Sequence, residues 1–281
     1  MPRPRKRFAQ HWLKDASVHR EIVAAAGLDK RPGARVLEIG PGTGQLTRRL
    51  LAAGAEVTAV EVDRDLCRLL RRQFDGEARF QLIETDFLKM PVPTDLDSVV
   101  ANIPYNITSP ILDKLLGSPK CPVEQFQGIV LLVQKEIASR LQAAPGSKAY
   151  GAMSVRSQYL AACQLVCDVP PSAFKPPPKV MSAVIHIRPR PFPQQARDPH
   201  WFSLLVRQGF ATRRKMLRNV LRSLVDRDAV SAALETLGLD PLSRAEALSV
   251  SDWVAFSNLM LASRLTPVST ARDLPSPPSE H

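Results

Sequence analysis

The chain has few cysteines and no long apolar run, and both absences limit what it can be. Four cysteines stand at positions 67, 121, 163 and 167 of its 281 residues, with no histidine cluster beside them. Neither a disulfide framework nor a metal site is therefore expected, and the thiols should be reduced, as in a cytoplasmic protein. No apolar run is as long as a membrane span, which needs about 18 residues. The basic N-terminus lacks the apolar stretch of a secretory signal.

Positive charge is what the chain has in excess. Its formal net charge is +11 and its pI is about 9.9. A surplus of this size points to a polyanionic partner. Hydrophobic residues make up 44% of the chain, which is enough to build the cores of one large domain and one small domain.

The first part of the chain has the pattern of an α/β fold. Short apolar runs alternate there with helical patterns, as in a mostly parallel sheet with helices on both faces. These runs lie at 35–40, 56–62, 80–85, 98–103 and 128–134. Two later runs, at 159–169 and 183–187, are close in sequence and are predicted to pair antiparallel at one edge of the sheet. Ligands of such sheets bind at the carboxyl ends of the strands.

From about residue 198 the pattern changes to helices alone. Helices are predicted at 199–211, 213–225, 228–237 and 252–263, after a connector that contains four prolines between 189 and 199. The expected division is a catalytic domain over 1–195 and a helical domain over 196–265. The residues 266–281 are rich in Pro, Ser and Thr and are expected to be a disordered tail.

A glycine-rich turn follows the first apolar run. The run ends in Gly40-Pro41-Gly42-Thr43-Gly44, and an amphipathic segment follows over 45–53. A strand, a glycine turn and a helix let a ligand approach bare backbone at a helix N-terminus. Gln45 stands where a dinucleotide fingerprint has its last glycine, so a nucleoside or amino-acid moiety is favoured over a pyrophosphate. An NAD-dependent oxidoreductase is disfavoured for the same reason.

Acidic residues end the next two apolar runs. Glu61 lies about twenty residues after the glycines, where an acid can accept hydrogen bonds from both ribose hydroxyls. Asp63 lies on the same side of the strand and is the alternative, although Glu61 is closer to the strand end. Asp86 ends the third run and could accept from the amino group of an adenine. For each acid, a solvated strand-end charge or a helix N-cap remains an alternative.

Asn102-Ile103-Pro104-Tyr105 follows the fourth apolar run. It places an amide, a stiff turn and an aromatic ring at the mouth of the predicted sheet. The amide and nearby main-chain carbonyls can bind the edge of a base, and the Tyr105 ring can stack on its face. The segment is suited to hold the exocyclic amine of a base swung out of a nucleic acid, although an ordinary strand-to-turn exit remains the alternative.

Three further segments, one of them N-terminal, complete a set of motifs. The combination and order of these motifs are specific to one family. They are Lys6-Arg7-Phe8-Ala9-Gln10-His11-Trp12-Leu13, Phe174-Lys175-Pro176-Pro177-Pro178-Lys179-Val180-Met181-Ser182-Ala183-Val184, and Phe210-Ala211-Thr212-Arg213-Arg214-Lys215-Met216-Leu217-Arg218-Asn219. With the glycine turn, the acids and the Asn102 segment, they resemble the KsgA family of ribosomal RNA adenine N6 dimethyltransferases over roughly residues 5 to 265. The N-terminal motif departs from the family's K-R-F-G-Q-N-F-L at Ala9, His11 and Trp12.

The resemblance implies a Rossmann-like methyltransferase sheet with a small C-terminal all-α domain. It implies S-adenosylmethionine-dependent N6,N6-dimethylation of two adjacent adenosines near the 3′ end of small-subunit (16S) ribosomal RNA, with a role in small-subunit biogenesis. The implied cofactor-binding residues are His11, Leu13, Gly40, Gly42, Glu61, Asp86 and Asn102. The implied catalytic residues are Asn102, Tyr105 and Phe174, with the two rings on opposite faces of the target adenine. A monomer without a membrane partner is expected.

Two basic clusters are candidate contacts for RNA phosphates. The first comprises Arg3, Arg5, Lys6 and Arg7, and the second comprises Arg213, Arg214, Lys215, Arg218 and Arg222. A solvated surface is the alternative for either cluster. Two other functions also stay open: a large-subunit adenine methyltransferase that confers antibiotic resistance, and a non-catalytic RNA-binding assembly factor that retains a methyltransferase shell.

Overall fold

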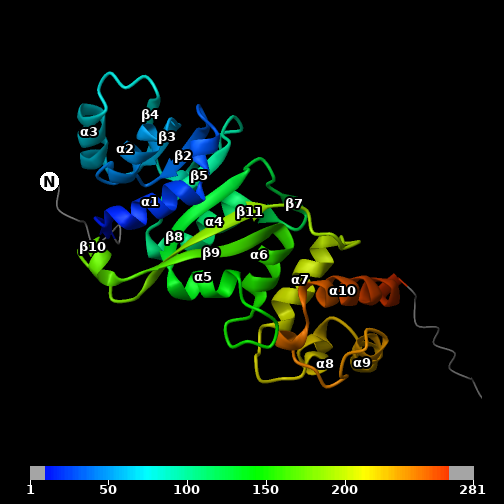
Figure 1. Cartoon of the computed structure of the whole chain (residues 1–281). Coiled ribbons are helices and arrows are strands. Elements are labelled where there is room, and N and C mark those ends of the chain that lie inside the picture. Colours follow the sequence, from blue (N-terminus) through cyan, green and yellow to red (C-terminus); the bar gives the residue numbers. More distant parts are fainter. Residues whose placement is uncertain (1–9, 266–281) are drawn as a thin grey trace, which may run out of the picture.

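A seven-stranded sheet forms the centre of the computed structural model, which describes residues 10–265 (Figure 1). The predicted cluster Arg3–Arg7 and the predicted tail 266–281 lie outside the described residues. The strand order is β4-β3-β2-β5-β8-β11-β9. The strands are β2 (Arg35–Ile39), β3 (Glu56–Glu61), β4 (Phe80–Glu84), β5 (Ser98–Asn102), β8 (Gly128–Gln134), β9 (Ala161–Val169) and β11 (Ser182–Pro189).

The pairings confirm the predicted mixed sheet. Strands β2, β3, β4, β5 and β8 are parallel neighbours, and β11 pairs antiparallel with both β8 and β9. Strand β9 begins later than predicted, because the helix before it continues to Leu160. The strand order reverses between β2 and β5, because β3 and β4 follow on one side of β2 and β5 lies on its other side. Ligands of open α/β sheets bind in the crevice at such a point.

Helices cover both faces of the sheet, because successive strand residues point to opposite sides. Val36 and Val100 pack on one face in a cluster with α1 and α2, whereas Leu37 and Val99 pack on the other face with α4, α5 and α6. The helices of this part are α1 (Ala16–Ala25), α2 (Gln45–Ala52), α3 (Arg64–Gln73), α4 (Thr108–Leu116), α5 (Lys135–Leu141) and α6 (Ala152–Leu160). Two short ladders complete it, β1 (Trp12–Leu13) with β10 (Phe174–Lys175) and β6 (Gly117–Ser118) with β7 (Cys121–Pro122).

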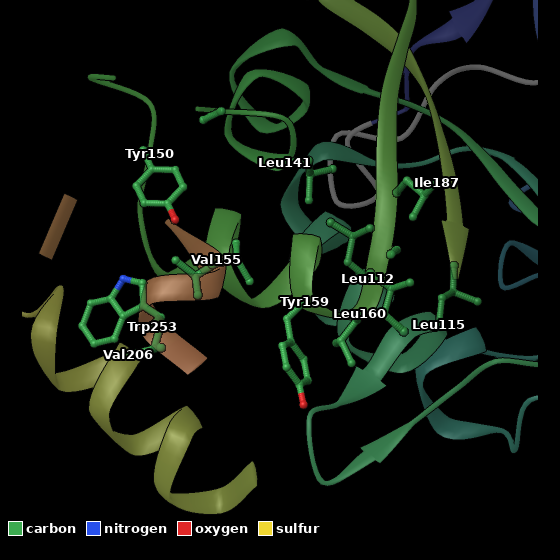
Figure 2. Close-up of a cluster of buried hydrophobic side chains, with 14 of the residues drawn as sticks. Leu112, Leu115, Leu141, Tyr150, Val155, Tyr159, Leu160, Ile187, Val206 and Trp253 are labelled. Carbon is green, nitrogen blue, oxygen red and sulfur yellow. The ribbon is translucent and has the colours of Figure 1, made fainter. Parts of the chain in front are cut away.

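The C-terminal helices share a hydrophobic core with the sheet. They are α7 (Pro199–Gly209), α8 (Leu217–Val220), α9 (Arg227–Thr236) and α10 (Val250–Leu265), and they gather beyond α5 and α6 (Figure 1). In Figure 2, Trp253 of α10 and Val206 of α7 lie beside Val155 of α6 within the cluster that also covers one face of the sheet. The Tyr150 hydroxyl donates to the main-chain oxygen of Leu248 at 2.9 Å. The helical part is therefore fixed relative to the sheet by buried contacts.

One predicted helix, 213–225, is wrong. Residues 211–216 form a turn, and the helix is limited to Leu217–Val220, followed by a 3-10 turn over Leu221–Ser223. A helix that began at 213 would place three consecutive cations at its N-terminus, where the helix dipole is positive. The turn is held in another way, because the backbone N–H of Leu217 donates to the main-chain oxygen of Ser243 at 2.9 Å. Within the described residues, no helix is both long enough and apolar enough to cross a membrane.

Candidate active site

A cavity of about 230 Å³ opens at the carboxyl ends of the parallel strands. Four successive strands each contribute to its lining, because parallel strands bring their ends to one edge. The contributing residues are Gly40 and Gly42 after β2, Glu61 at the end of β3, Asp86 after β4 and Asn102 at the end of β5. The structure thus brings together residues that are up to 62 positions apart in the chain, from Gly40 to Asn102.

The glycine turn supplies bare backbone beside this cavity. Gly42 has a φ of +59°, and a Cβ there would lie 3.4 Å from the indole ring of Trp12. Gly44 caps α2 with a φ of +75°, and a Cβ there would lie 2.8 Å from Phe74. Side chains at these positions would strain the backbone and crowd the neighbouring rings. The glycines therefore serve close packing as well as ligand access.

The Glu61 carboxylate is a buried acid in the wall of the cavity. One of its oxygens accepts from the backbone N–H groups of Val62 and Asp63, both at 2.9 Å, and the other accepts from Gly42 at 3.3 Å. Glu61 is only 6% exposed, and this burial raises its pKa above the ordinary value although the three N–H groups oppose the shift. The carboxylate also ties the glycine turn to β3, so the loop is preorganised.

Asp63 and Asp86 both act as caps. Asp63 accepts from the N–H of Asp65 at 3.0 Å at the start of α3, and it does not line the cavity. The geometry thus favours Glu61 over Asp63 as the acid that faces a ligand. Asp86 accepts from the N–H of Leu88 at 3.0 Å, so its N-cap role is real, but it lines the cavity as well.

Asn102 and Tyr105 also line the cavity and are held in place by hydrogen bonds. The side-chain nitrogen of Asn102 donates to the main-chain oxygen of His11 at 3.1 Å, which leaves its carbonyl oxygen available to accept. The Tyr105 hydroxyl lies 2.6 Å from the hydroxyl of Ser182. The Tyr105 ring is stacked with the His11 ring at 5.7 Å between centroids. Both groups are therefore oriented before any base enters.

The N-terminal motif reaches the cavity by pairing with the segment at 174. Trp12 is opposite Lys175 and Leu13 is opposite Phe174 in the β1–β10 ladder. The ring of His11 lines the cavity, and its Nδ1 is 2.8 Å from the main-chain oxygen of Pro176. Leu13 is buried and lines a smaller recess next to the cavity. Phe174 is 2% exposed and is not among the residues that line the cavity, so its role beside a base stays a prediction.

Glu38 is a buried acid that the sequence analysis did not single out. It lies in β2 with 1% exposure, and its carboxylate accepts from the Thr47 hydroxyl at 2.6 Å. Burial, with a smaller contribution from the charge of Glu61, raises the pKa of Glu38 to about 8 although the Thr47 hydrogen bond opposes the shift, so the group is largely protonated at neutral pH. Its position inside the apolar run Val36-Leu37-Glu38-Ile39 could have indicated a buried acid.

Glu38→Gln should remove a pH dependence of stability. In the unfolded chain Glu38 loses its proton near 4.5, whereas in the folded protein it keeps the proton until about 8. The folded state thus binds more protons within this window, and stability falls as pH rises through it, by up to about 1.4 kcal/mol per pH unit. Thermal unfolding of both proteins at pH 5, 6.5 and 8 measures the difference. We expect the advantage of the Gln variant to grow with pH, and a constant difference would contradict the assignment.

The basic segment lies on an exposed turn of the helical part. Arg213 donates to the main-chain oxygen of Lys148 at 2.7 Å and pairs with Glu246 at 3.5 Å. Arg214 and Lys215 are exposed and form no ion pair with any described residue. Arg218 is half-buried, and its Nε has no hydrogen-bond partner in the described structure. These four members of the predicted basic cluster are therefore not equivalent.

Three features define a Rossmann-like, S-adenosylmethionine-dependent methyltransferase: the sheet order, the glycine turn that Glu61 ties to β3, and the amide that ends β5 with the ring that follows it. The family model for ribosomal RNA adenine dimethylase matches residues 1–261. The chain belongs to the ribosomal RNA adenine dimethylase family.

Similar proteins agree with this assignment. The ribosomal RNA small subunit methyltransferase A of Synechococcus sp. (strain JA-3-3Ab) is 63% identical over 263 residues, which cover 93% of this chain and 94% of the relative. A dimethyladenosine transferase from Plasmodium falciparum has a similar crystal structure, with a TM-score of 0.73 and 28% identity over 88% of this chain and 96% of that one. The 23S rRNA methyltransferase ErmE has a TM-score of 0.69 and 27% identity over 89% and 99% of the two chains.

Proposed function

We propose that this protein transfers methyl groups from S-adenosylmethionine to the N6 atoms of two adjacent adenosines near the 3′ end of small-subunit ribosomal RNA. The observation that carries the proposal is that Glu61 and Asn102 line the same cavity. The Glu61 carboxylate is suited to bind a ribose, and the Asn102 amide is suited to bind an amine. The similarity to ribosomal RNA small subunit methyltransferase A, at 63% identity, supports the choice of RNA. We expect the protein to act in the cytoplasm as a monomer during small-subunit biogenesis.

The residues of the cavity fit the cofactor. Glu61 presents a buried carboxylate that can accept from the two ribose hydroxyls, and Asp86 can accept from the adenine amino group of the cofactor. The glycine turn lies next to Glu61, which accepts from the Gly42 N–H, and the indole of Trp12 with its unpaired N–H lies beside Gly42. When bound, S-adenosylmethionine supplies a methyl group on a cationic sulfonium.

Asn102 and Tyr105 would hold the target base. The N6 amine is a poor nucleophile because its lone pair is delocalised into the ring. Hydrogen bonds from N6 to the Asn102 carbonyl oxygen and to a main-chain carbonyl near Ile103 would favour a pyramidal nitrogen. Its lone pair could then point at the methyl carbon, while Tyr105 stacks on the base. Holding both reactants in this geometry contributes several kcal/mol, at best about 7–11.

No strong general base is required by this arrangement. The N6 nitrogen becomes acidic only after it has gained the methyl group, so its proton can pass to water. We propose Phe174 for the second face of the base, which requires its ring to move out of the buried position that it has between β1 and the sheet.

The choice between ribosomal subunits is open to a direct test. The relative named for the small subunit is 63% identical, whereas the one named for 23S rRNA is 27% identical, and this difference favours the small subunit. The experiment is mass mapping of RNA from isolated small and large subunits after treatment with the protein and labelled S-adenosylmethionine. Two dimethylated adenosines in small-subunit RNA are expected. Label in large subunits alone would overturn the proposal, and no label in either would favour the assembly factor without activity.

Arg214 and Lys215 should contribute to RNA affinity through charge. Replacing both by alanine should weaken binding most at low salt and lower the slope of log K against log salt by about 1 to 2 units. The measurement is a titration of small subunits at several salt concentrations. Arg213→Ala is the contrasting variant, because its ion pair and its bond to Lys148 give it a structural role that should appear as lost stability. A slope equal to that of the parent would show that the two exposed side chains do not meet phosphates.

A further inference from the structure

Trp12 has a buried hydrogen-bond donor without a partner. Its Nε1 is inaccessible to solvent and makes no hydrogen bond to any described residue. An indole N–H is a donor only, and leaving it buried and unpaired costs about 1–3 kcal/mol. Such a cost is tolerated where the missing partner is a ligand.

This N–H belongs to a side chain at the boundary between the cofactor cavity and a small recess. Trp12 lines both, together with Gly40, Gly42 and Asn102. The N–H lies close to Gly42, because a Cβ added to that glycine would be 3.6 Å from the Trp12 Nε1. The recess has a volume of about 30 Å³, which is room for one small polar group.

The surroundings of the recess favour an anionic acceptor. Thr43 and Gln45 line it at the N-terminus of α2, an eight-residue helix whose positive dipole end points there. Glu38 also lines it, and the raised pKa of about 8 keeps this acid largely neutral, so it does not repel an anion.

The cofactor offers few groups that can accept from an indole. Its ammonium and sulfonium groups do not accept, its adenine ring nitrogens would lie with the adenine amino group near Asp86, and its ribose hydroxyls would donate to Glu61. We propose that the Trp12 N–H donates a hydrogen bond to the carboxylate of the methionine moiety of S-adenosylmethionine. The residue would thus hold the amino-acid end of the cofactor, in addition to packing on Gly42.

This inference rests on the proposed cofactor site, and ligand binding separates the two. The variant is Trp12→Phe, which keeps an aromatic ring on Gly42 but removes the donor. The ligands are S-adenosylhomocysteine, which has the carboxylate, and 5′-methylthioadenosine, which lacks the whole amino-acid end. Isothermal titration gives the affinity of each ligand for each protein. Trp201→Phe is the matched control, since it makes the same change in α7, away from both cavities.

We expect Trp12→Phe to weaken S-adenosylhomocysteine binding about tenfold, as for a hydrogen bond to a charged group, and 5′-methylthioadenosine binding by less than about twofold. Equal losses for both ligands would mean that Trp12 only packs, and no loss for either would mean that the N–H does not contact the ligand. Either result overturns the inference while leaving the cofactor site intact. Failure of both ligands to bind the parent would overturn the site itself.

The parent protein provides a second readout that needs no substitution. The chain has three tryptophans, so ¹⁵N-labelled protein gives three indole N–H signals. S-adenosylhomocysteine should move one of them downfield, as expected for a new bond to a carboxylate, and 5′-methylthioadenosine should not. The signal that moves should be the one missing in Trp12→Phe. If both ligands shift it equally, the carboxylate is not the acceptor.

Discussion

Asn102→Ala should lower the rate of methyl transfer by about 10³-fold, which corresponds to about 4 kcal/mol of transition-state stabilisation. The affinity for S-adenosylhomocysteine should change by less than about tenfold. The reason is that the Asn102 carbonyl oxygen would accept from the reacting amine, whose charge and acidity develop only as the methyl group arrives. An interaction that strengthens in the transition state changes turnover more than binding.

The hydrogen bond between Asn102 and His11 sharpens this experiment. Alanine removes the acceptor for the base and also the donor to the His11 main-chain oxygen. Asn102→Asp keeps an acceptor but places a carboxylate against that oxygen, so it separates the two losses. We expect the Asp variant to keep more activity than the Ala variant if the acceptor matters more. Single-turnover methyl transfer to small subunits measures the rates, with ligand affinity and thermal unfolding as controls. Near-parental turnover of Asn102→Ala would remove Asn102 from the catalytic role.

Much of the architecture could be predicted because parallel strands align their ends. The sequence predicts parallel strands at 35–40, 56–62, 80–85 and 98–103. The residues at the ends of such strands must lie at one edge of the sheet, and Gly40, Glu61, Asp86 and Asn102 do so. The choice between Glu61 and Asp63 needed the structure. Both lie on one side of the strand, and only the start of α3 shows that Asp63 is used as its cap.

Contacts between distant segments were beyond the sequence pattern. The β1–β10 ladder joins residues 12–13 to 174–175, which is how the His11 main chain comes to lie beside Asn102. The burial of Phe174 follows from the same ladder and is not visible in its motif. The failed helix at 213 has a different cause, because its apolar spacing suggested a helix while its charges opposed one.

Glu61→Gln should weaken the binding of S-adenosylhomocysteine about 100-fold, or about 2.7 kcal/mol. A carboxylate can accept from two hydroxyls at once, and bonds to a charged acceptor are about twice as strong as those to a neutral one. The amide retains one acceptor, but its NH₂ group would face the backbone N–H groups or the ribose, all of which are donors. Isothermal titration measures the affinity at pH 8, where the carboxylate is more fully charged than at lower pH.

Two controls test this prediction: the pH dependence of the ligand affinity, and substitution of the neighbouring acid Asp63. Burial raises the pKa of Glu61, so a protonated fraction persists to a higher pH than for an exposed Glu. Only the deprotonated group accepts from both hydroxyls, and affinity should therefore rise with pH in the parent more than in Glu61→Gln. Asp63→Ala should cost about 1 kcal/mol of stability through its lost N-cap and leave the affinity nearly unchanged. If Asp63→Ala lost the affinity and Glu61→Gln kept it, the ribose would have to lie on Asp63, and the cavity would be entered from the side of α3.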